Sequence, residues 1–96
     1  MILARVVGTV VATRKDPRLE GKKLLVLQHI NPDHTPKATY VVALDTVGAG
    51  VTDTVICISG SSARMASGMK DTPVDTAIVG IIDEISIDTV RDTGTS

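Results

Sequence analysis

The apolar residues of this chain are almost all Val, Ile, Leu and Ala, and this constrains its fold more than any other feature. The sequence has one Tyr and no Phe or Trp, although 43% of its residues are hydrophobic. Small β-branched side chains pack well on the pleated surface of a sheet and lose side-chain freedom in a helix. The chain is therefore predicted to be an all-β protein.

Five segments rich in these residues are predicted to be strands. They cover residues 2–13, 24–30, 39–45, 54–59 and 77–87. Gly8 and Gly80 interrupt the first and last segments, where glycine often marks a β-bulge. The proline-rich turn at residues 31–36 predicts a hairpin between the second and third strands.

One short helix is predicted over residues 61–67, with Ser61 or Ser62 as its N-cap. Together, these elements predict a small, five-stranded, partly open β-barrel of the oligonucleotide/oligosaccharide-binding type with one short helix. Ninety-six residues suffice for one domain. We expect it to span residues 1–90, followed by a polar tail at residues 91–96.

Charge and composition bear on the partners of the chain. A formal net charge of −1 gives no electrostatic reason to bind nucleic acid or an anionic membrane. A single aromatic residue also offers no stacking platform for bases. Cys57 is the only cysteine, so an internal disulfide is excluded, and a reducing cytoplasmic compartment is expected. Arg5 and Gly8 break up the first apolar run, which argues against a signal peptide.

The stretch from Asp45 to Arg64 is predicted to build the surface by which the protein acts on other copies of itself. Two turns of small residues, at 48–50 and 60–64, flank the fourth strand. At least one of Gly48 and Gly50 is expected to adopt a backbone conformation unfavourable for other residues, or to lie where another chain approaches closely.

Both turns have chemical alternatives. Gly48-Ala49-Gly50 lacks the third glycine of a dinucleotide-binding loop, because Asp53 stands there, and no helix follows. The turn at 60–64 does not fit the Gly-x-Ser-x-Gly elbow of hydrolases, because Arg64 stands where the last glycine would be. That turn remains open to two interpretations: a structural interface turn, or an anion- or solvent-lined site.

Other polar clusters are interpreted as structural. His29, Asp33 and His34 have weak spacing for a metal site and are assigned to a surface turn. Cys57 is assigned to an inert strand position. The acids nearest the two turns are expected to cap turns or to pair with arginine rather than form a catalytic pair. These acids are Asp45, Asp75, Asp83 and Glu84. No catalytic residue, cofactor or metal is predicted.

Five blocks in series resemble the EutN/CcmL family of pentameric vertex proteins of bacterial microcompartments. The blocks are Val6-x-Gly8-x-Val10-Val11-x-Thr13-x-Lys15; Leu19-x-Gly21-x-Lys23-Leu24-Leu25; Ala43-x-Asp45-x-Val47-Gly48-Ala49-Gly50; Gly60-Ser61-Ser62-Ala63-Arg64; and Pro73-Val74-Asp75 with Ile78-Val79-Gly80-Ile81-Ile82-Asp83. The resemblance runs from about residue 2 to about residue 85. It leaves out the turn at 31–38 and the tail after 87.

This resemblance implies a structural protein and no enzyme. Members of the family form pentamers that cap the vertices of polyhedral shells otherwise tiled by hexameric shell proteins. The implied partners are therefore four further copies of the chain and hexameric shell proteins, within the cytoplasm. The carboxysome and several metabolosomes are the kinds of shell concerned.

Particular residues are assigned to the assembly. Asp45, Gly48, Gly50, Arg64 and Asp75 are candidates for the subunit interface. Arg64 is expected to pair with Asp45 or Asp75. Ser61 and Ser62 are candidates for lining the opening on the five-fold axis, because small polar residues with free amides suit a narrow mouth.

Two other functions remain open at this stage. A small barrel of this type suits binding of an oligosaccharide or single-stranded nucleic acid, although one aromatic residue argues against it. A small hydrolase using Ser62 would be labelled by a serine-reactive probe.

Overall fold

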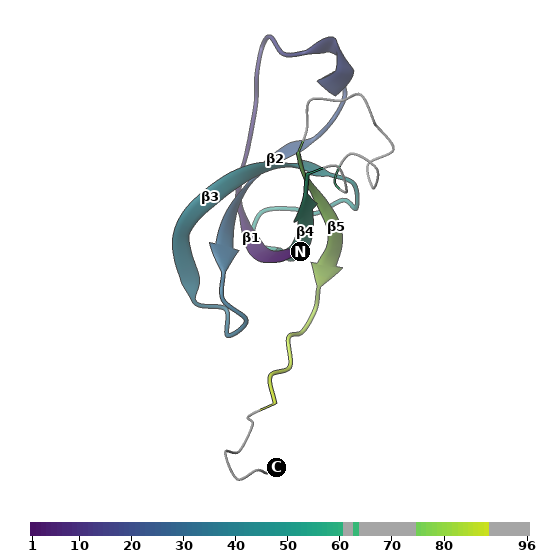
Figure 1. Ribbon diagram of the computed structural model, residues 1–96. Helices are drawn as coiled ribbons and strands as arrows, with labels where there is room; N and C mark the ends of the chain where they lie inside the picture. The colour runs from purple at the N-terminus through teal and green to yellow at the C-terminus, as the bar shows by residue number, and fades with distance from the viewer. Residues whose placement is uncertain (61–62, 64–74, 89–96) are drawn as a thin grey trace.

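The five predicted strands are present and form one barrel (Figure 1). The computed structural model describes residues 1–60, 63 and 75–88. The strands are β1 (Ile2–Thr9), β2 (Leu24–Ile30), β3 (Pro36–Asp45), β4 (Thr54–Ser59) and β5 (Thr76–Ile82), with a short 3₁₀ helix, η1 (Pro17–Leu19), before β2. The all-β barrel predicted from the sequence is confirmed.

The barrel is closed, where the sequence suggested one that is partly open. Its strand order is β1-β2-β3-β5-β4, and β4 returns to pair with β1. Four of the five contacts are antiparallel. The fifth joins β3 and β5 in parallel through only two register pairs, Leu44 with Ala77 and Asp45 with Ile78. This short parallel contact closes the barrel and has fewer paired residues than any other strand pair in it.

The second, third and fourth strands along the chain match their predicted bounds better than the first and the last. β2 and β4 coincide with prediction, and β3 begins earlier, at Pro36. β1 was predicted to continue to residue 13 but ends at Thr9, beyond which Val11 is 90% exposed. β5 was predicted to continue to residue 87 but ends at Ile82. Val10 still donates its amide to the carbonyl oxygen of Leu24 in β2 at 3.0 Å. Beyond Val10 and beyond Ile82 the sequence is strand-like, but no described strand pairs with it. Apart from Ala63, the predicted helix lies outside the described residues, as does the tail at 91–96.

The core follows the two-residue alternation of the strands. Along β1, Ala4 and Val6 are buried while Arg5 and Val7 are exposed. The buried cluster comprises Ala4, Val6, Leu25, Leu27, Ala43, Ala49, Val55, Cys57 and Ile78. The barrel interior is thus filled with aliphatic side chains and one cysteine, with no aromatic ring. Burial of each larger aliphatic side chain contributes about 1.5–3 kcal/mol to the free energy of folding.

Both predicted bulge regions are irregular. The pairing of β1 with β2 shifts between Val6 and Gly8. The pairing of β4 with β5 shifts so that Cys57 faces Ile78 while Ile56 faces Gly80. Such bulges increase strand bending, which a five-stranded barrel needs in order to close.

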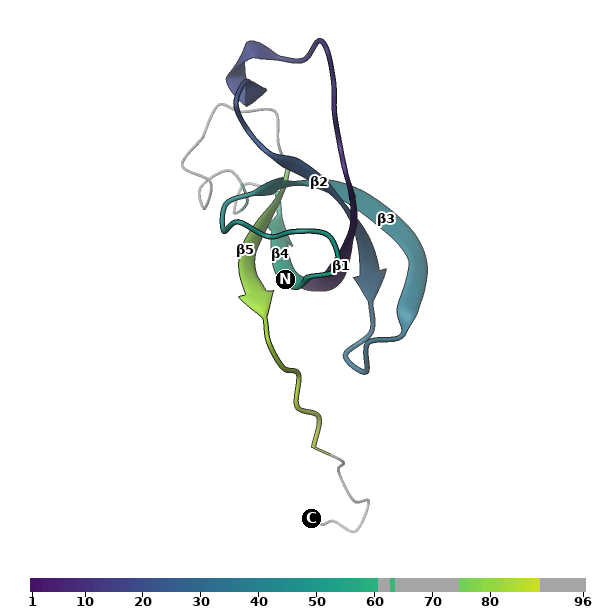
Figure 2. The ribbon, with the colours of Figure 1, turned by 180° about the vertical axis from the view of Figure 1, so that it is seen from behind.

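Two described segments leave the barrel at opposite ends (Figures 1 and 2). The loop between β1 and β2 carries η1, whose N-cap is Asp16. Asp16 accepts hydrogen bonds from the backbone amide and guanidinium of Arg18. These bonds lower the pKa of Asp16 to about 2. At the other end, residues 83–88 continue beyond β5.

Candidate subunit interface

The turn after β3 is organised by the carboxylate of Asp45. Its Oδ1 accepts hydrogen bonds from three successive backbone amides, those of Val47, Gly48 and Ala49, at 3.0, 3.1 and 3.2 Å. Its Oδ2 lies 3.4 Å from the Nζ of Lys23. The Asp45 side chain is only 3% exposed, so these partners replace water around its charge. Asp45 therefore fixes the shape of the turn.

Lys23 joins this turn to the start of β2. Its ammonium also donates to the carbonyl oxygen of Ala49, and its own carbonyl accepts from the amide of Asp45 at 2.9 Å. Lys23 belongs to the second block of the family resemblance, but no role was predicted for it from the sequence. The signal was nonetheless available, because extending the predicted β2–β3 hairpin by one residue places 23 opposite 45.

Gly48 has the conformation that was expected of at least one of the two glycines. Its φ is +81°, a left-handed value that residues with a Cβ rarely adopt. Gly50 is not in that region, and an added Cβ there would lie 4.0 Å from Asp53 Oδ2. The backbone requirement is therefore confirmed for Gly48 alone.

The following turn is tied to β1. The amide of Gly50 donates to Asp53 Oδ2 at 2.8 Å. Val6 donates its amide to the carbonyl of Asp53 and accepts from the amide of Thr52, both at 2.9 Å. The whole segment from Asp45 to Asp53 is thus attached to the barrel wall, and Ala49 is fully buried beneath it.

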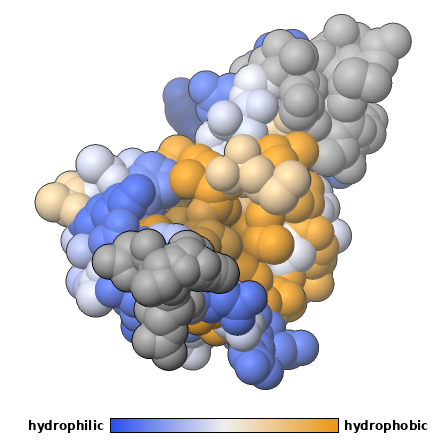
Figure 3. All heavy atoms as spheres, turned by 60° about the horizontal axis from the view of Figure 1, so that its bottom comes forward, coloured by the Kyte–Doolittle hydropathy of each residue, from blue (hydrophilic) through white to orange (hydrophobic). Residues whose placement is uncertain are grey.

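The outer wall carries two separate apolar surfaces. The first, here called the β4 surface, consists of Leu3, Ile56 and Ile58, which are half-buried and alternate with inward residues. Leu3 and Ile56 are register partners across β1 and β4. Figure 3 shows hydrophobic side chains gathered on the side of the barrel that carries β4 and β5.

The second apolar surface, called the β3 surface, lies across β2 and β3. Val26 and Val42 are register partners, and Tyr40 is two residues along β3. Val42 is 48% exposed and Tyr40 is 61% exposed. β5, which belongs to neither surface, lies between them on one side of the barrel, whereas on the other side β1 with Leu3 and β2 with Val26 are neighbouring strands. The chain therefore has two apolar surfaces made of different residues.

The remaining predicted interface residues are only partly described. Asp75 is exposed, and its carbonyl oxygen accepts from the amide of Gly60 at 2.8 Å. Arg64, Ser61 and Ser62 lie outside the described residues. Lys23 is the cation beside Asp45 in the described part of the chain. The pairing of Arg64 with Asp45 or Asp75 and the lining of the opening by Ser61 or Ser62 stay predictions.

Local hydrogen bonds hold the turn between β2 and β3 and the strand ends beside it. His29 Nδ1 lies 2.7 Å from Thr39 Oγ1, and Asp33 Oδ1 accepts from the amide and hydroxyl of Thr35. The hydrogen bond from the Thr35 hydroxyl lowers the pKa of Asp33. Within residues 1–60, 63 and 75–88, no three His, Cys, Asp or Glu side chains are grouped so as to hold a metal ion.

Among the described residues, neither the cysteine nor the aromatic residue belongs to a recognisable active site. Cys57 is fully buried in the barrel, and burial raises the pKa of its thiol. Tyr40 is the only aromatic residue of the chain, so a stacking surface of several rings is excluded. Among the described residues, no helix is both long and apolar enough to cross a membrane.

A small closed barrel with exposed apolar residues on its outer wall and a hydrogen-bonded polar turn is typical of a protein that contacts other subunits. The comparisons with known proteins identify the family. The model for "Ethanolamine utilisation protein EutN/carboxysome" matches residues 1–83. The chain belongs to the EutN/CcmL family.

Relatives from two kinds of shell are similar over nearly the whole chain. The carboxysome shell vertex protein CcmL of Synechocystis is 46% identical, covering 91% of this chain and 87% of its own length. The microcompartment shell vertex protein GrpN of Rhodospirillum rubrum is 44% identical, covering 88% of this chain and 96% of its own length.

Solved structures of relatives share the fold. The structure of CcmL from Gloeobacter violaceus aligns with a TM-score of 0.86 at 44% identity, covering 92% of this chain and 91% of that one. The structure of GrpN, described as a pentameric microcompartment shell protein, aligns with a TM-score of 0.84 at 42% identity. That alignment covers 92% of this chain and the whole of GrpN.

Proposed function

We propose that this protein is a structural shell protein of a bacterial microcompartment, forming homopentamers that cap the vertices of the shell. The observation that carries the proposal is the match over nearly the full chain to relatives named as shell vertex proteins, of both carboxysomes and other microcompartments. Under this proposal the protein lies in the cytoplasm, within the shell, and has a structural rather than an enzymatic role. Hexameric shell proteins are its proposed neighbours.

The two apolar surfaces support a ring. A contact between unlike surfaces is heterologous, and it closes into a ring when the rotation between subunits permits. The β4 surface of one copy and the β3 surface of the next are suitable halves of such a contact. The number five comes from the pentameric relative rather than from the barrel itself.

Native mass spectrometry of the purified protein tests the proposal directly. The expected species has a mass of about 50 kDa, five times the 10.0 kDa of one chain. A well-folded protein that stays monomeric at micromolar concentration would contradict the assembly. Closed hexamers alone would contradict the vertex role, because six-fold symmetry fits a facet.

The interface assignment includes Arg64. We propose that its guanidinium pairs with a carboxylate at the subunit contact, such as that of Asp75. We also propose that Asp45, Gly48 and Gly50 shape the adjoining turn. Removing one partner of a partly buried pair leaves the other charge uncompensated. Arg64→Ala is therefore expected to weaken assembly more than Arg91→Ala, measured by subunit dissociation on dilution. Equal effects would reduce Arg64 to a surface charge.

The opening on the axis is assigned to small polar residues. We propose that Ser61 or Ser62 lies nearest the five-fold axis, and that the charged loop before β2 lies further out, where neighbouring shell proteins are available to it. A structure of the assembled ring tests this. If neither serine faces the opening, the assignment is wrong while the vertex function stands.

A further inference from the structure

The strand β3 has a long edge that no described strand pairs with. Its contact with β5 is limited to Leu44 and Asp45 at its C-terminal end. Towards its N-terminal end the two strands diverge, as both ribbon views show (Figures 1 and 2). The open edge of β3 is thus residues 36–42 on the side facing away from β2.

The direction of the backbone groups follows from the pairing with β2. The amide of Asp45 donates to Lys23, so this pair is hydrogen bonded. In an antiparallel ladder such pairs alternate with pairs whose amides and carbonyls point to the other side. Counting along the register, Val42 and Tyr40 belong to the second kind. Leu44, next in this series, uses its groups to meet β5 at Ala77. Tyr40 and Val42 present theirs at the open edge.

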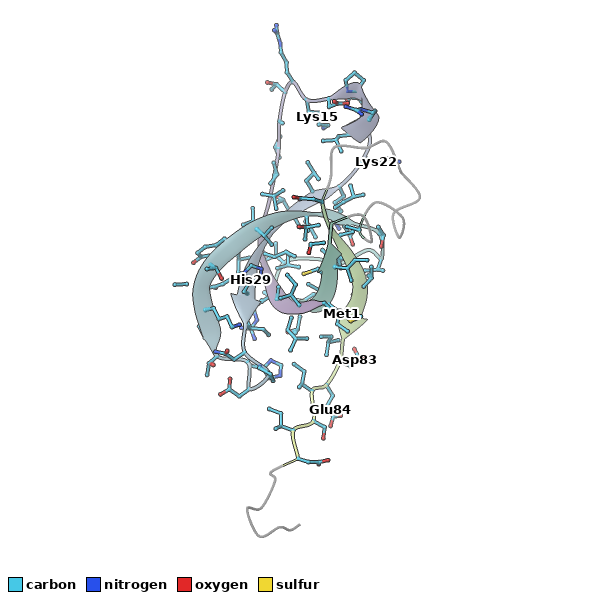
Figure 4. All side chains as sticks on the ribbon, viewed as in Figure 1. Met1, Lys15, Lys22, His29, Asp83 and Glu84 are labelled. Carbon is cyan, nitrogen blue, oxygen red and sulfur yellow. The ribbon has the colours of Figure 1, made fainter. Side chains whose placement is uncertain are left out.

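The segment after β5 has the opposite property: it is extended chain without a described partner strand. Residues 83–88 have no regular secondary structure and lead away from the barrel wall. Figure 4 shows Asp83 and Glu84 along this segment, beyond the arrowhead of β5. Ile85 and Ile87 alternate with polar residues, and Ile87 is 57% exposed. This two-residue alternation is typical of a strand that covers an apolar surface on one side.

We propose that residues 83–88 of one subunit add a strand to the open β3 edge, residues 36–42, of the neighbouring subunit in the ring. Strand addition satisfies the edge amides and carbonyls, and places alternate side chains against the receiving sheet. The inference rests on the proposed homopentamer, which supplies the second copy.

Length and charge fit this occupant. Six residues of donor meet seven of open edge, which is about the length of an ordinary strand. The donor carries three carboxylates, those of Asp83, Glu84 and Asp88. The edge carries Lys37, whose charge is opposite to that of the donor's carboxylates. Arg5 lies two strands away on β1, at the far end of the outward row that runs through Gln28 to Tyr40.

The contact also continues the apolar surfaces described above. The donor follows directly from β5, beside the β4 surface. The acceptor edge borders the β3 surface at Val42 and Tyr40. One subunit thus offers the β4 surface with the donor strand, and its neighbour offers the β3 surface with the open edge. That is a head-to-tail contact of the kind that closes rings.

Variants of the donor strand test the proposal in the full chain. Ile87→Asp and Ile85→Pro alter apolar contact and strand pairing respectively, and neither residue lies in the buried core cluster. Val11→Asp is the matched control, because Val11 is also an exposed aliphatic residue but lies in the loop after β1. Subunit dissociation on dilution is measured by native mass spectrometry. Each donor variant is expected to raise the half-dissociation concentration at least about tenfold, and Val11→Asp to leave it unchanged.

Cross-linking between singly substituted chains locates the contact. Tyr40→Cys protein is mixed with Ile87→Cys protein, dissociated and reassembled, and oxidised; Val11→Cys replaces Ile87→Cys as the control. Disulfides form only where Cα atoms come within about 7 Å. A linked pair of the first two chains, absent from the control, supports the proposal.

Contrary outcomes are distinct. Stable rings with unchanged dissociation in both donor variants and no cross-link overturn the strand addition and leave the pentamer standing. A double variant, Tyr40→Cys with Ile87→Cys, that yields only a disulfide within one chain also overturns it. Wild-type protein that never assembles instead contradicts the proposed function.

Discussion

Gly48 has a backbone conformation that favours glycine over residues with a Cβ. Its φ of +81° is left-handed, and nothing lies within 4 Å of an added Cβ, so any penalty is conformational rather than steric. We expect Gly48→Ala to lower the free energy of unfolding by about 1–2 kcal/mol. Gly50→Ala is the matched control, since Gly50 has no positive φ. Chemical denaturation of both variants checks this, and equal losses would contradict it.

Cys57 is predicted to be an unreactive thiol in the folded protein. It is fully buried, and burial raises its pKa above the ordinary value of 9.0. A thiol reagent at about pH 8 is expected to modify it only after unfolding, because the thiolate is the reactive form. Rapid labelling of the native protein would contradict this.

The raised pKa of Cys57 also predicts how the free energy of unfolding changes at alkaline pH. Because the folded thiol has the raised pKa, its contribution is complete below the ordinary value and is lost as pH rises above it. Stability should therefore fall more steeply above about pH 9 in the wild type than in Cys57→Ala, in which the other titrating groups are unchanged. Parallel pH profiles would contradict the prediction.

At the scale of elements, the Asp45 turn is stabilised more by amides than by its ion pair. Three backbone amides depend on Oδ1, whereas Lys23 is 50% exposed and contributes about 0–1 kcal/mol. Asp45→Ala is expected to cost about 1–3 kcal/mol by leaving donors unsatisfied. Asp45→Asn keeps an acceptor oxygen and should recover most of that loss. Denaturation curves distinguish them; equal losses would assign the effect to the charge.

The strands show how far sequence reaches. β2 and β4 were predicted with their observed bounds because their alternation stops at charged or glycine-containing turns. β1 and β5 were predicted too long, since the apolar pattern continues past Thr9 and Ile82, where no described strand pairs with it apart from one hydrogen bond from Val10 to Leu24. The apolar pattern of a segment shows that it is able to pack on an apolar surface. A strand additionally requires a neighbouring strand to pair with. The overlong prediction for β5 is thus the same fact that motivates strand addition.

Long-range pairing was the less predictable part. The parallel contact of β3 with β5 joins residues 33 apart through two register pairs, as Leu44 with Ala77 shows, and no local signal specifies it. The Lys23–Asp45 pair was accessible in principle from the hairpin register. The candidate site was predicted at the level of the Asp45 turn and Gly48, whereas the apolar surfaces required the barrel, because exposure depends on which neighbours each strand acquires.

At the scale of the whole molecule, a ring requires that the two apolar surfaces act as unlike halves of one contact. Val42→Asp places a charge on the β3 surface, and Ile56→Asp places one on the β4 surface. Each variant alone is expected to be largely monomeric, because every contact of a homogeneous ring then contains one damaged half.

Mixing the two variants gives the decisive result. A Val42→Asp chain keeps an intact β4 surface, and an Ile56→Asp chain keeps an intact β3 surface, so one undamaged contact joins them. The other two halves of that pair are damaged, and the ring cannot continue. The mixture should therefore contain heterodimers of about 20 kDa, twice the 10.0 kDa of a chain, measured by native mass spectrometry. If the contact instead joined identical surfaces, each variant alone would keep one intact surface and form homodimers through it, which would contradict the head-to-tail ring.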